Sequence, residues 1–541
     1  MIDKGSLAPL RFLALLLLLP LSAFAADPAQ HPAPSIAHQD GRFALMVDGA
    51  PYFILGAQVN NSSGWPAALQ AVWPNAERMH LNTIEVPVYW EQIEPRPGQF
   101  DFSDVDAILD QTREHHLHLI LLWFGTWKNG KMHYAPEWVK EDTAKYPRMI
   151  TPEGRPIDVL SPNSPANLDA DSTAFAALMK HLRERDSTEH TVLMMQVENE
   201  VGVLGDARDH SAAADRAFAA AVPAQLTAYL ARHREGLYPD LRDLWDANGA
   251  RSSGTWTEVF GAGERADEIF MAWQYAGFIH AVAARGKAEY DLPMYVNTWL
   301  AADSEPPGLY PSGGPEPRVM DVWKAAGPGL DFYAPDLYAA DFAAWCRRYH
   351  RDGNPLYMPE TRGEAAGAAN VFYALGEEAG FGFSPFGIET EAAGASDPLG
   401  ESYKAIAAIA PQLLAHQSSG DVHGFVLDRD HSRVDFTMNG YTVHVSLDSI
   451  FGNQTESGFG LVMADGKDGF LGVGKGFRVS FSPYPETAPG AGIGAVQEGR
   501  FEDGQWIAGR RLNGDENAQG EYWRFDSRQV RTEKVSLYRY E

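Results

Sequence analysis

Short apolar runs alternate with stretches of helical periodicity over residues 45–418 of the chain. Eight runs are apolar at nearly every position and end in polar or turn-forming residues: 52–57, 82–88, 117–123, 191–197, 294–297, 331–335, 355–359 and 381–386. Runs of this kind predict strands that are buried on both faces. Helical patterns lie between them, at 103–109, 174–185, 270–290, 340–349 and 403–416. Eight strands alternating with helices predict an α/β fold, a (β/α)₈ TIM barrel.

An open doubly wound sheet is the alternative arrangement of such strands and helices. It would place a glycine-rich phosphate loop after the first strand, whereas residues 58–61 are Gln-Val-Asn-Asn. The barrel is therefore the preferred prediction.

The pattern changes at about residue 419. Apolar and polar residues alternate with period two in 441–447, 477–481 and 535–538, and glycines are frequent. This alternation predicts half-buried antiparallel strands. We expect a catalytic barrel over residues 45–418 and an all-β, sandwich-like domain over residues 419–541.

The N-terminus has the organisation of an export signal. Lys4 and Arg11 precede an apolar run, and Ala23-Phe24-Ala25 forms a small-residue cleavage site. We expect residues 1–25 to be a cleaved signal peptide, residues 26–44 to be a linker, and the protein to be periplasmic or secreted. The alternative is a retained anchor, for which the apolar run is short.

Charge and cysteine content narrow the possible partners. The chain of 541 residues has 44 basic and 72 acidic residues and a formal net charge of -28. Such a surface repels nucleic acid and anionic membranes and is compatible with a neutral substrate.

Cys346 is the single cysteine, so no intrachain disulfide can form. His115, His116 and His118 lie at the start of the third predicted strand and have no clustered carboxylate, so we expect no metal and no cofactor.

Polar residues at strand ends suggest the chemistry. The active site of a TIM barrel lies at the carboxyl ends of its strands. The fourth predicted strand runs into Asn199-Glu200, and the seventh ends at Glu360. Two carboxyl groups facing one cavity can hydrolyse a glycoside, one protonating the leaving oxygen and the other attacking the anomeric carbon. The alternative is that each glutamate forms a structural ion pair, for example with Arg362.

Residues 196–202, QVENEVG, resemble the acid/base motif of glycoside hydrolase family 35, the β-galactosidases. Residues 90–102 resemble the segment after the second strand of that family. The resemblance covers roughly residues 45–415, the extent that one barrel needs. Pro87 and the segments 124–130 and 358–362 depart from the usual pattern, and the chain resembles a bacterial branch with its own all-β C-terminal domain.

The wider clan of retaining barrel glycosidases, which the chain resembles, implies a role for several residues. By that match Glu200 is the acid/base, Glu360 is the nucleophile, and Asn199 holds the sugar 2-hydroxyl. Tyr338 matches the position that hydrogen-bonds the nucleophile.

Further residues are candidates for contact with a sugar. Residues two apart on a strand share a face, so Glu198 should also point inward, as a structural or a sugar-contacting carboxylate. Flat aromatic rings can stack on the apolar faces of pyranoses. The aromatic candidates near strand ends are Trp65, Trp90, Trp127, Trp299, Trp323 and Tyr338, and the polar candidates are Asn60, Asn297 and Lys128. For any one aromatic residue the alternative is an ordinary place in the core.

A long insertion of about 90 residues follows the fourth strand, where a few residues are usual. Long loops after barrel strands shape the pocket, so we expect a deep site that recognises a terminal sugar. The hypothesis is an exported retaining exo-β-galactosidase that acts on plant-type oligosaccharides or polysaccharides. The alternatives are another retaining barrel exo-β-glycosidase, such as a β-glucosidase or exo-β-glucosaminidase, or a non-catalytic carbohydrate-binding protein.

Overall fold

The computed structural model describes residues 32–540, except residues 40, 352, 391–396, 451–452, 486–489, 503 and 513. The predicted signal peptide, residues 1–25, and the first part of the predicted linker lie outside the described residues. Within the described ranges, every helix is too short or too polar to cross a lipid bilayer.

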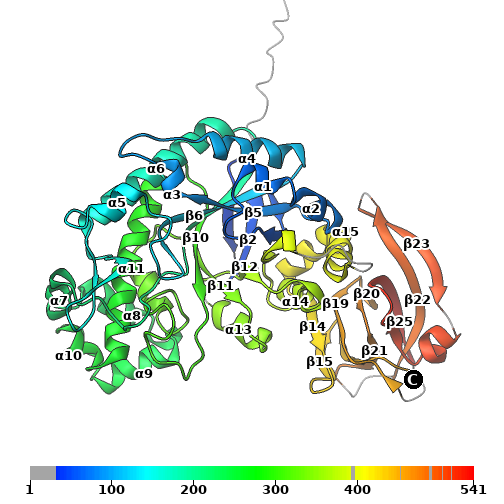
Figure 1. Ribbon diagram of the computed structural model, residues 1–541. Coiled ribbons are helices and arrows are strands. Elements are labelled where there is room, and N and C mark those ends of the chain that lie inside the picture. The colour runs from blue at the N-terminus through cyan, green and yellow to red at the C-terminus, as the bar shows by residue number, and fades with distance from the viewer. Residues whose placement is uncertain are drawn as a thin grey trace, which may run out of the picture.

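Eight parallel strands close into a barrel, which confirms the predicted TIM barrel (Figure 1). Each predicted strand overlaps an observed one. In chain order they are β4 (Ile54–Gln58), β5 (Thr83–Tyr89), β6 (His118–Lys128), β9 (Val192–Asn199), β10 (Met294–Trp299), β11 (Phe332–Leu337), β12 (Tyr357–Thr361) and β13 (Gly382–Pro385). The barrel closes where β13 pairs with β4.

The continuous apolar runs are explained by burial on both faces of the strands. In β6, Ile120 and Leu122 belong to the core inside the barrel, whereas Leu119, Leu121 and Trp123 pack against the surrounding helices. Both faces are removed from water, so both must be apolar.

The barrel helices are α1 (Pro66–Leu69), α2 (Trp73–Arg78), α3 (Trp90–Ile93), α4 (Ser103–Glu114), α5 (Glu137–Glu141), α6 (Pro165–Asp186), α11 (Glu264–Lys287), α12 (Met320–Ala326), α13 (Phe342–Tyr349), α14 (Glu364–Gly376) and α15 (Pro398–Ser419). Ser164 caps α6 by accepting the N–H of Asn167, and Pro165 occupies its first turn. A Cβ at Gly286 of α11 would lie 2.3 Å from Phe175 of α6, so glycine is required where these two helices cross.

A small antiparallel sheet precedes the barrel and corrects the predicted linker over residues 26–44. It consists of β1 (Ser35–Gln39), β2 (Arg42–Val47) and β3 (Ala50–Tyr52). Leu45 and Val47 of β2 are buried in the same core as the residues inside the barrel. Burial of these side chains orders a segment whose Pro- and His-rich surroundings suggested a linker.

The insertion after β9 is mainly helical and lies to one side of the barrel (Figure 1). It contains α7 (Ala212–Ala219), α8 (Ala224–Arg232), η1 (Arg234–Gly236), α9 (Pro239–Ala247) and α10 (Trp256–Phe260). A shorter hairpin, β7 (Arg148–Ile150) and β8 (Pro156–Leu160), follows β6. The short η2 (Ile388–Thr390) follows β13.

Two antiparallel sheets form the C-terminal region, which confirms the predicted all-β domain class. One sheet contains β14 (Val422–Leu427), β19 (Gly458–Ala464), β20 (Gly469–Lys475), β25 (Arg531–Tyr540), β22 (Gly490–Glu502) and β23 (Gln505–Leu512). The other contains β15 (Arg433–Met438), β16 (Tyr441–Leu447), β21 (Phe477–Pro483) and β24 (Trp523–Phe525). The pair β17 (Ser449–Ile450) and β18 (Asn453–Gln454) and the helix η3 (Gly514–Gly520) complete the region.

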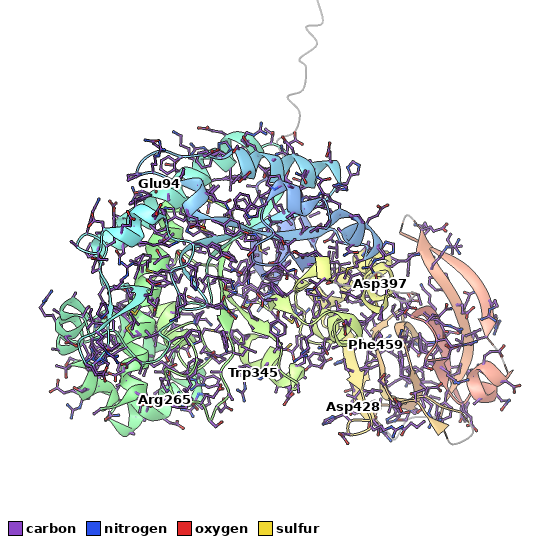
Figure 2. All side chains as sticks on the ribbon, in the orientation of Figure 1. Glu94, Arg265, Trp345, Asp397, Asp428 and Phe459 are labelled. Atoms are coloured by element: carbon purple, nitrogen blue, oxygen red, sulfur yellow. The ribbon has the colours of Figure 1, made fainter. Side chains whose placement is uncertain are left out.

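Strand β19 of the first of these sheets is buried on both faces. Val462 of β19 packs with Val443 of β16 and Trp523 of β24 in the core between the two sheets. Phe459, on the opposite face of β19, packs on the barrel, and its ring lies 5.4 Å from that of Phe372 in α14. Figure 2 labels Phe459 at this junction. The β-domain therefore rests on the outer helices of the barrel.

Candidate active site

A pocket of about 530 Å³ opens at the carboxyl ends of the barrel strands. Glu200 directly follows β9, and Glu360 lies near the end of β12, so the structure brings the two predicted catalytic carboxyl groups into one cavity. The residues that line the pocket are Asn129, Glu200, Trp299, Leu300, Ala302, Glu305, Asp336, Tyr338, Ala339, Trp345 and Glu360.

Glu360 is held from two sides. The hydroxyl of Tyr338 donates to its Oε1 at 2.8 Å, and Nε2 of Gln58 donates to its Oε2 at 3.2 Å. Burial raises the pKa of Glu360, while the charge of Lys128 and these two hydrogen bonds oppose the rise. Tyr338 therefore has the neighbour that the resemblance implied, and both donors favour the ionised form of Glu360.

Glu200 has a different environment. Its backbone N–H donates to Oδ1 of Asn297 at 2.9 Å, and its Oε2 accepts a hydrogen bond from Nδ2 of Asn129. The ammonium of Lys128 donates in turn to Oδ1 of Asn129. Burial, followed by the negative charge of Glu360, raises the pKa of Glu200 to about 7. Glu200 can therefore retain a proton near neutral pH.

Asp336 is a third carboxyl group in the pocket, and sequence reasoning missed it. It lies on β11, where it pairs in register with Glu360 of β12. Nδ2 of Asn297 donates to its Oδ2 at 2.6 Å. The rule that found Glu200 and Glu360, a polar residue at the carboxyl end of a buried strand, also applies to Asp336. Asn129, likewise missed, follows the end of β6.

Asn199, the last residue of β9, is fully buried. Neither its Oδ1 nor its Nδ2 has a hydrogen-bond partner among the described residues. Asn199 is not among the residues that line the pocket, but it directly precedes Glu200, which is. A buried amide without a partner is costly, so its donor and acceptor are unused by the described residues.

Asn60 lies outside the residues that line the pocket. Its backbone N–H donates to Glu389 at 2.9 Å, and its Oδ1 lies 3.1 Å from the place that a Cβ at Gly387 would take. We therefore assign it to the packing of the η2 segment rather than to sugar binding.

Glu198 is buried away from the pocket, contrary to the alternation of the strand. Its φ of 64° places it in the left-handed region, and this turn of the backbone breaks the period-two pattern. Its carboxyl group accepts the backbone N–H of Thr126 at 3.0 Å and of Trp127 at 2.6 Å, and it lies beside Asp171 of α6. These contacts, and its absence from the residues that line the pocket, favour the structural role of Glu198 over the sugar-contacting one.

The aromatic candidates divide into exposed and buried rings. Trp299 is 43% exposed and Tyr338 is 37% exposed, and both line the pocket. Trp65 is also exposed, but it lies elsewhere, with its ring 6.3 Å from that of Tyr89.

Trp90 and Trp127, predicted to contact the sugar, are instead fully buried in the core. The indole N–H of Trp90 donates to Glu94 at 3.0 Å, and that of Trp127 donates to the carbonyl of Leu160 at 3.1 Å. Trp323 is buried in the same way. Large aromatic side chains near strand ends serve packing as readily as binding, which is why position alone did not separate them.

The histidine cluster begins β6 at the end of the barrel opposite the pocket. His115 stacks on Trp73, and His118 forms a hydrogen bond with the carbonyl of His190. Over the described part of the chain, no three or more His, Cys, Asp or Glu side chains are grouped as metal ligands.

Two family models match parts of the chain. The model of glycoside hydrolase family 42, described as "Beta-galactosidase", matches residues 65–251, a range that includes Asn199 and Glu200. A domain of unknown function, DUF5597, matches residues 399–524, which run from α15 into β24. The family 42 match supports a resemblance to β-galactosidases, and it does not single out family 35.

Curated relatives are similar over part of their length. A β-galactosidase of Xanthomonas manihotis is 34% identical over 220 residues, which are 39% of this chain and 33% of that protein. Beta-galactosidase 8 of Oryza sativa subsp. japonica is 27% identical over 199 residues, 36% of this chain and 28% of that protein. The chain thus matches about a third or less of these relatives.

Solved structures of two β-galactosidases align with part of the chain. The β-galactosidase from Rahnella sp. R3 aligns with a TM-score of 0.42 and 16% identity over 66% of this chain and 56% of that one. The β-galactosidase from Halorubrum lacusprofundi aligns with a TM-score of 0.44 and 15% identity over 65% and 58%.

Proposed function

We propose that the chain is a retaining exo-β-galactosidase that removes terminal β-D-galactosyl residues by double displacement. The observation that carries this proposal is the pair Glu200 and Glu360 in one pocket, with one carboxyl group able to hold a proton and the other stabilised as an anion. Environments that separate the protonation states of two carboxyl groups are what acid–nucleophile chemistry requires.

In the first step an oxygen of Glu360 attacks the anomeric carbon. The bond from that carbon to the leaving oxygen breaks, and Glu200 gives its proton to this oxygen. The products are a glycosyl ester on Glu360, a free aglycone and an ionised Glu200.

In the second step the ionised Glu200 takes a proton from water. The water oxygen attacks the anomeric carbon, the ester bond breaks, and Glu360 leaves as a carboxylate. Two displacements at the same carbon retain its configuration. The carboxyl groups of a retaining pair stand about 5–5.5 Å apart, against about 6.5–9.5 Å for an inverting pair.

Substrate recognition is assigned to residues around this pair. The amide of Asn199, buried without a partner among the described residues, is available for the sugar 2-hydroxyl. The exposed ring of Trp299 supplies a flat apolar surface in the pocket. The partial similarity to β-galactosidases favours galactose. Plant-type galactosides remain our hypothesis for the natural substrate, and membership of family 35 is proposed from residues 196–202.

Export and domain organisation are part of the same proposal. The basic and apolar N-terminus with its Ala-Phe-Ala site supports a signal peptide over residues 1–25 and a periplasmic or secreted enzyme. We assign catalysis to the barrel, residues 45–418, and an accessory role to the β-domain, residues 419–541, because every residue that lines the pocket belongs to the barrel.

Hydrolysis of aryl β-D-galactoside, β-D-glucoside and β-D-glucosaminide substrates tests the proposal. The galactoside should give the highest kcat/KM, and proton NMR should detect β-galactose as the first product. Preference for another sugar would favour the alternative exo-β-glycosidases. If α-galactose were the first product, the mechanism would not be retaining. If the protein bound sugar without hydrolysing any substrate, the alternative of a non-catalytic carbohydrate-binding protein would be supported.

A further inference from the structure

One asparagine, Asn297, links Asp336 to Glu200 through hydrogen bonds. Oδ1 of Asn297 accepts the backbone N–H of Glu200 at 2.9 Å, and Nδ2 of Asn297 donates to Oδ2 of Asp336 at 2.6 Å. Because one atom of the amide accepts and the other donates, its orientation is fixed. The strands β9, β10 and β11 therefore hold Glu200, Asn297 and Asp336 in a defined row.

The second oxygen of Asp336, Oδ1, is buried, and no N–H or hydroxyl group in the described parts of the chain donates to it. The carboxyl groups of Asp336 and Glu200 lie within hydrogen-bond reach of each other. Two ionised carboxylates have no hydrogen to share, so this contact requires a proton on one of them.

The surrounding groups decide which carboxyl group holds that proton. Asp336 is 3% exposed and faces the anions of Glu360 and Glu200. Three tyrosine hydroxyls also interact electrostatically with its charge, those of Tyr295, Tyr338 and Tyr349. Lys128 is the cation that faces it, but its ammonium is bonded to Asn129. Burial, and then the charges of Glu360 and Glu200, raise the pKa of Asp336 well above its usual range.

We propose that Asp336 is a positioning residue that stays protonated and donates its O–H to Glu200. The inference rests on the proposed function of the pocket. When Glu200 gives its proton to the leaving oxygen, it becomes an anion, and the hydrogen bond from Asp336 stabilises that anion together with Asn129. A neutral Asp336 also avoids a third negative charge beside Glu360.

Asp336→Asn tests the protonation state, because asparagine is neutral and keeps a donor. Asn297 would hold the new Oδ1, which leaves Nδ2 for Glu200. We expect kcat/KM within about fivefold of the wild type and the alkaline limb of its pH profile within about 0.3 pH unit. If Asp336 were ionised, its replacement would remove a negative charge and move the alkaline limb to lower pH by about one unit. That shift would overturn the proposal.

Asp336→Leu tests the donor. Without the O–H, the ionised form of Glu200 is less stable, so the alkaline limb should move to higher pH by about one unit and kcat should fall about tenfold. A folded variant with an unchanged limb would overturn the proposal. If the leucine variant does not fold, the asparagine variant still decides. Asp303→Asn, which removes an exposed carboxylate paired with Arg348, is the matched control and should leave the limb unchanged.

An infrared difference spectrum separates this inference from the proposed function. The wild type minus Asp336→Asn should contain the carbonyl stretch of one protonated carboxyl group at neutral pH. Its absence would overturn the proposal. If the wild type hydrolyses none of the β-glycosides, the proposed function fails, and the same infrared band still determines whether Asp336 is protonated.

Discussion

Glu198 and Glu200 stand two residues apart at the end of the same strand, and each lies beside an aspartate, yet the two regions differ in access to solvent. Glu200 and Asp336 line the pocket. Glu198 and Asp171 are sealed between β6, β9 and α6, where two backbone N–H groups and the side chains of Trp123 and Thr126 surround them. One pair can meet a substrate, and the other cannot.

The comparison shows that a perturbed pKa does not by itself identify a catalytic group. Burial raises the pKa of both glutamates, and a neighbouring carboxyl group adds to the rise in each case. Both glutamates have a positive φ, 64° at Glu198 and 43° at Glu200, so backbone conformation does not separate them either. The difference lies in the contacts of their side chains: the carboxyl group of Glu198 accepts backbone N–H groups at the end of β6, whereas Glu200 lines the pocket. The predictions below ask whether one pair serves chemistry and the other stability.

Glu360→Ala should give the largest loss. Without the nucleophile no glycosyl ester can form, and we expect kcat to fall about 10⁴-fold or more on every substrate. Azide should restore turnover of an aryl galactoside with α-galactosyl azide as product, identified by NMR. Formation of the β-azide would contradict the assignment.

Glu200→Ala should be nearly as harmful for natural substrates and milder for activated ones. General acid catalysis contributes about 10²–10⁴-fold, so substrates with poor leaving groups should lose that much. Aryl galactosides with good leaving groups need no proton in the first step and should show a burst of phenol. Azide should accelerate turnover and give the β-azide, because the anion needs no general base. Equal losses for good and poor leaving groups would show that Glu200 is not the acid.

The sequence predicted more of the barrel than of the pocket wall. Eight apolar runs alternating with helical patterns are a strong signature of the fold, and the strand-end rule singled out Glu200 and Glu360 from the sequence. The sequence did not predict β1 and β2, because the two buried side chains of β2, Leu45 and Val47, are covered by barrel residues that lie far away in the chain. Trp90 and Trp299 carry the same local signal, and the tertiary packing that buries one and exposes the other is not encoded in local spacing. Asp336 was within reach of the same rule.

The alkaline limb of the wild-type pH profile should report the pKa of Glu200. Glu200 works as the protonated acid, and its pKa is raised to about 7, so kcat/KM should fall tenfold per pH unit above about 7 and be nearly constant just below it. In Glu200→Ala, assayed with an activated aryl galactoside, this alkaline limb should vanish. Its persistence there would assign the limb to another group.

Glu198→Gln should change stability more than chemistry. The glutamine amide would turn a donor towards the N–H of Thr126 or Trp127, and we expect a loss of about 1–3 kcal/mol in the free energy of unfolding, measured in urea. In contrast, kcat/KM for an aryl galactoside should change less than about tenfold. Glu200→Gln is the matched control, and above pH 7, where Glu200 is ionised, it should leave the unfolding free energy unchanged or higher, because it removes a buried charge. If Glu200→Gln lowered the unfolding free energy more than Glu198→Gln, the assignment of Glu198 to stability and Glu200 to chemistry would be wrong.

Trp299→Ala should have the smallest effect, since this ring lines the pocket but is 43% exposed and takes no part in the bond-breaking steps. Loss of a stacking surface is worth about 0.5–1.5 kcal/mol, so KM for an aryl galactoside should rise up to about tenfold while kcat stays nearly constant. Tyr540→Ala, which removes an exposed ring of β25 far along the chain from the pocket, is the control and should leave KM unchanged. A fall in kcat with KM unchanged would show that Trp299 stabilises the transition state and not the bound substrate. Removal of an interaction made only in the transition state lowers kcat and kcat/KM equally.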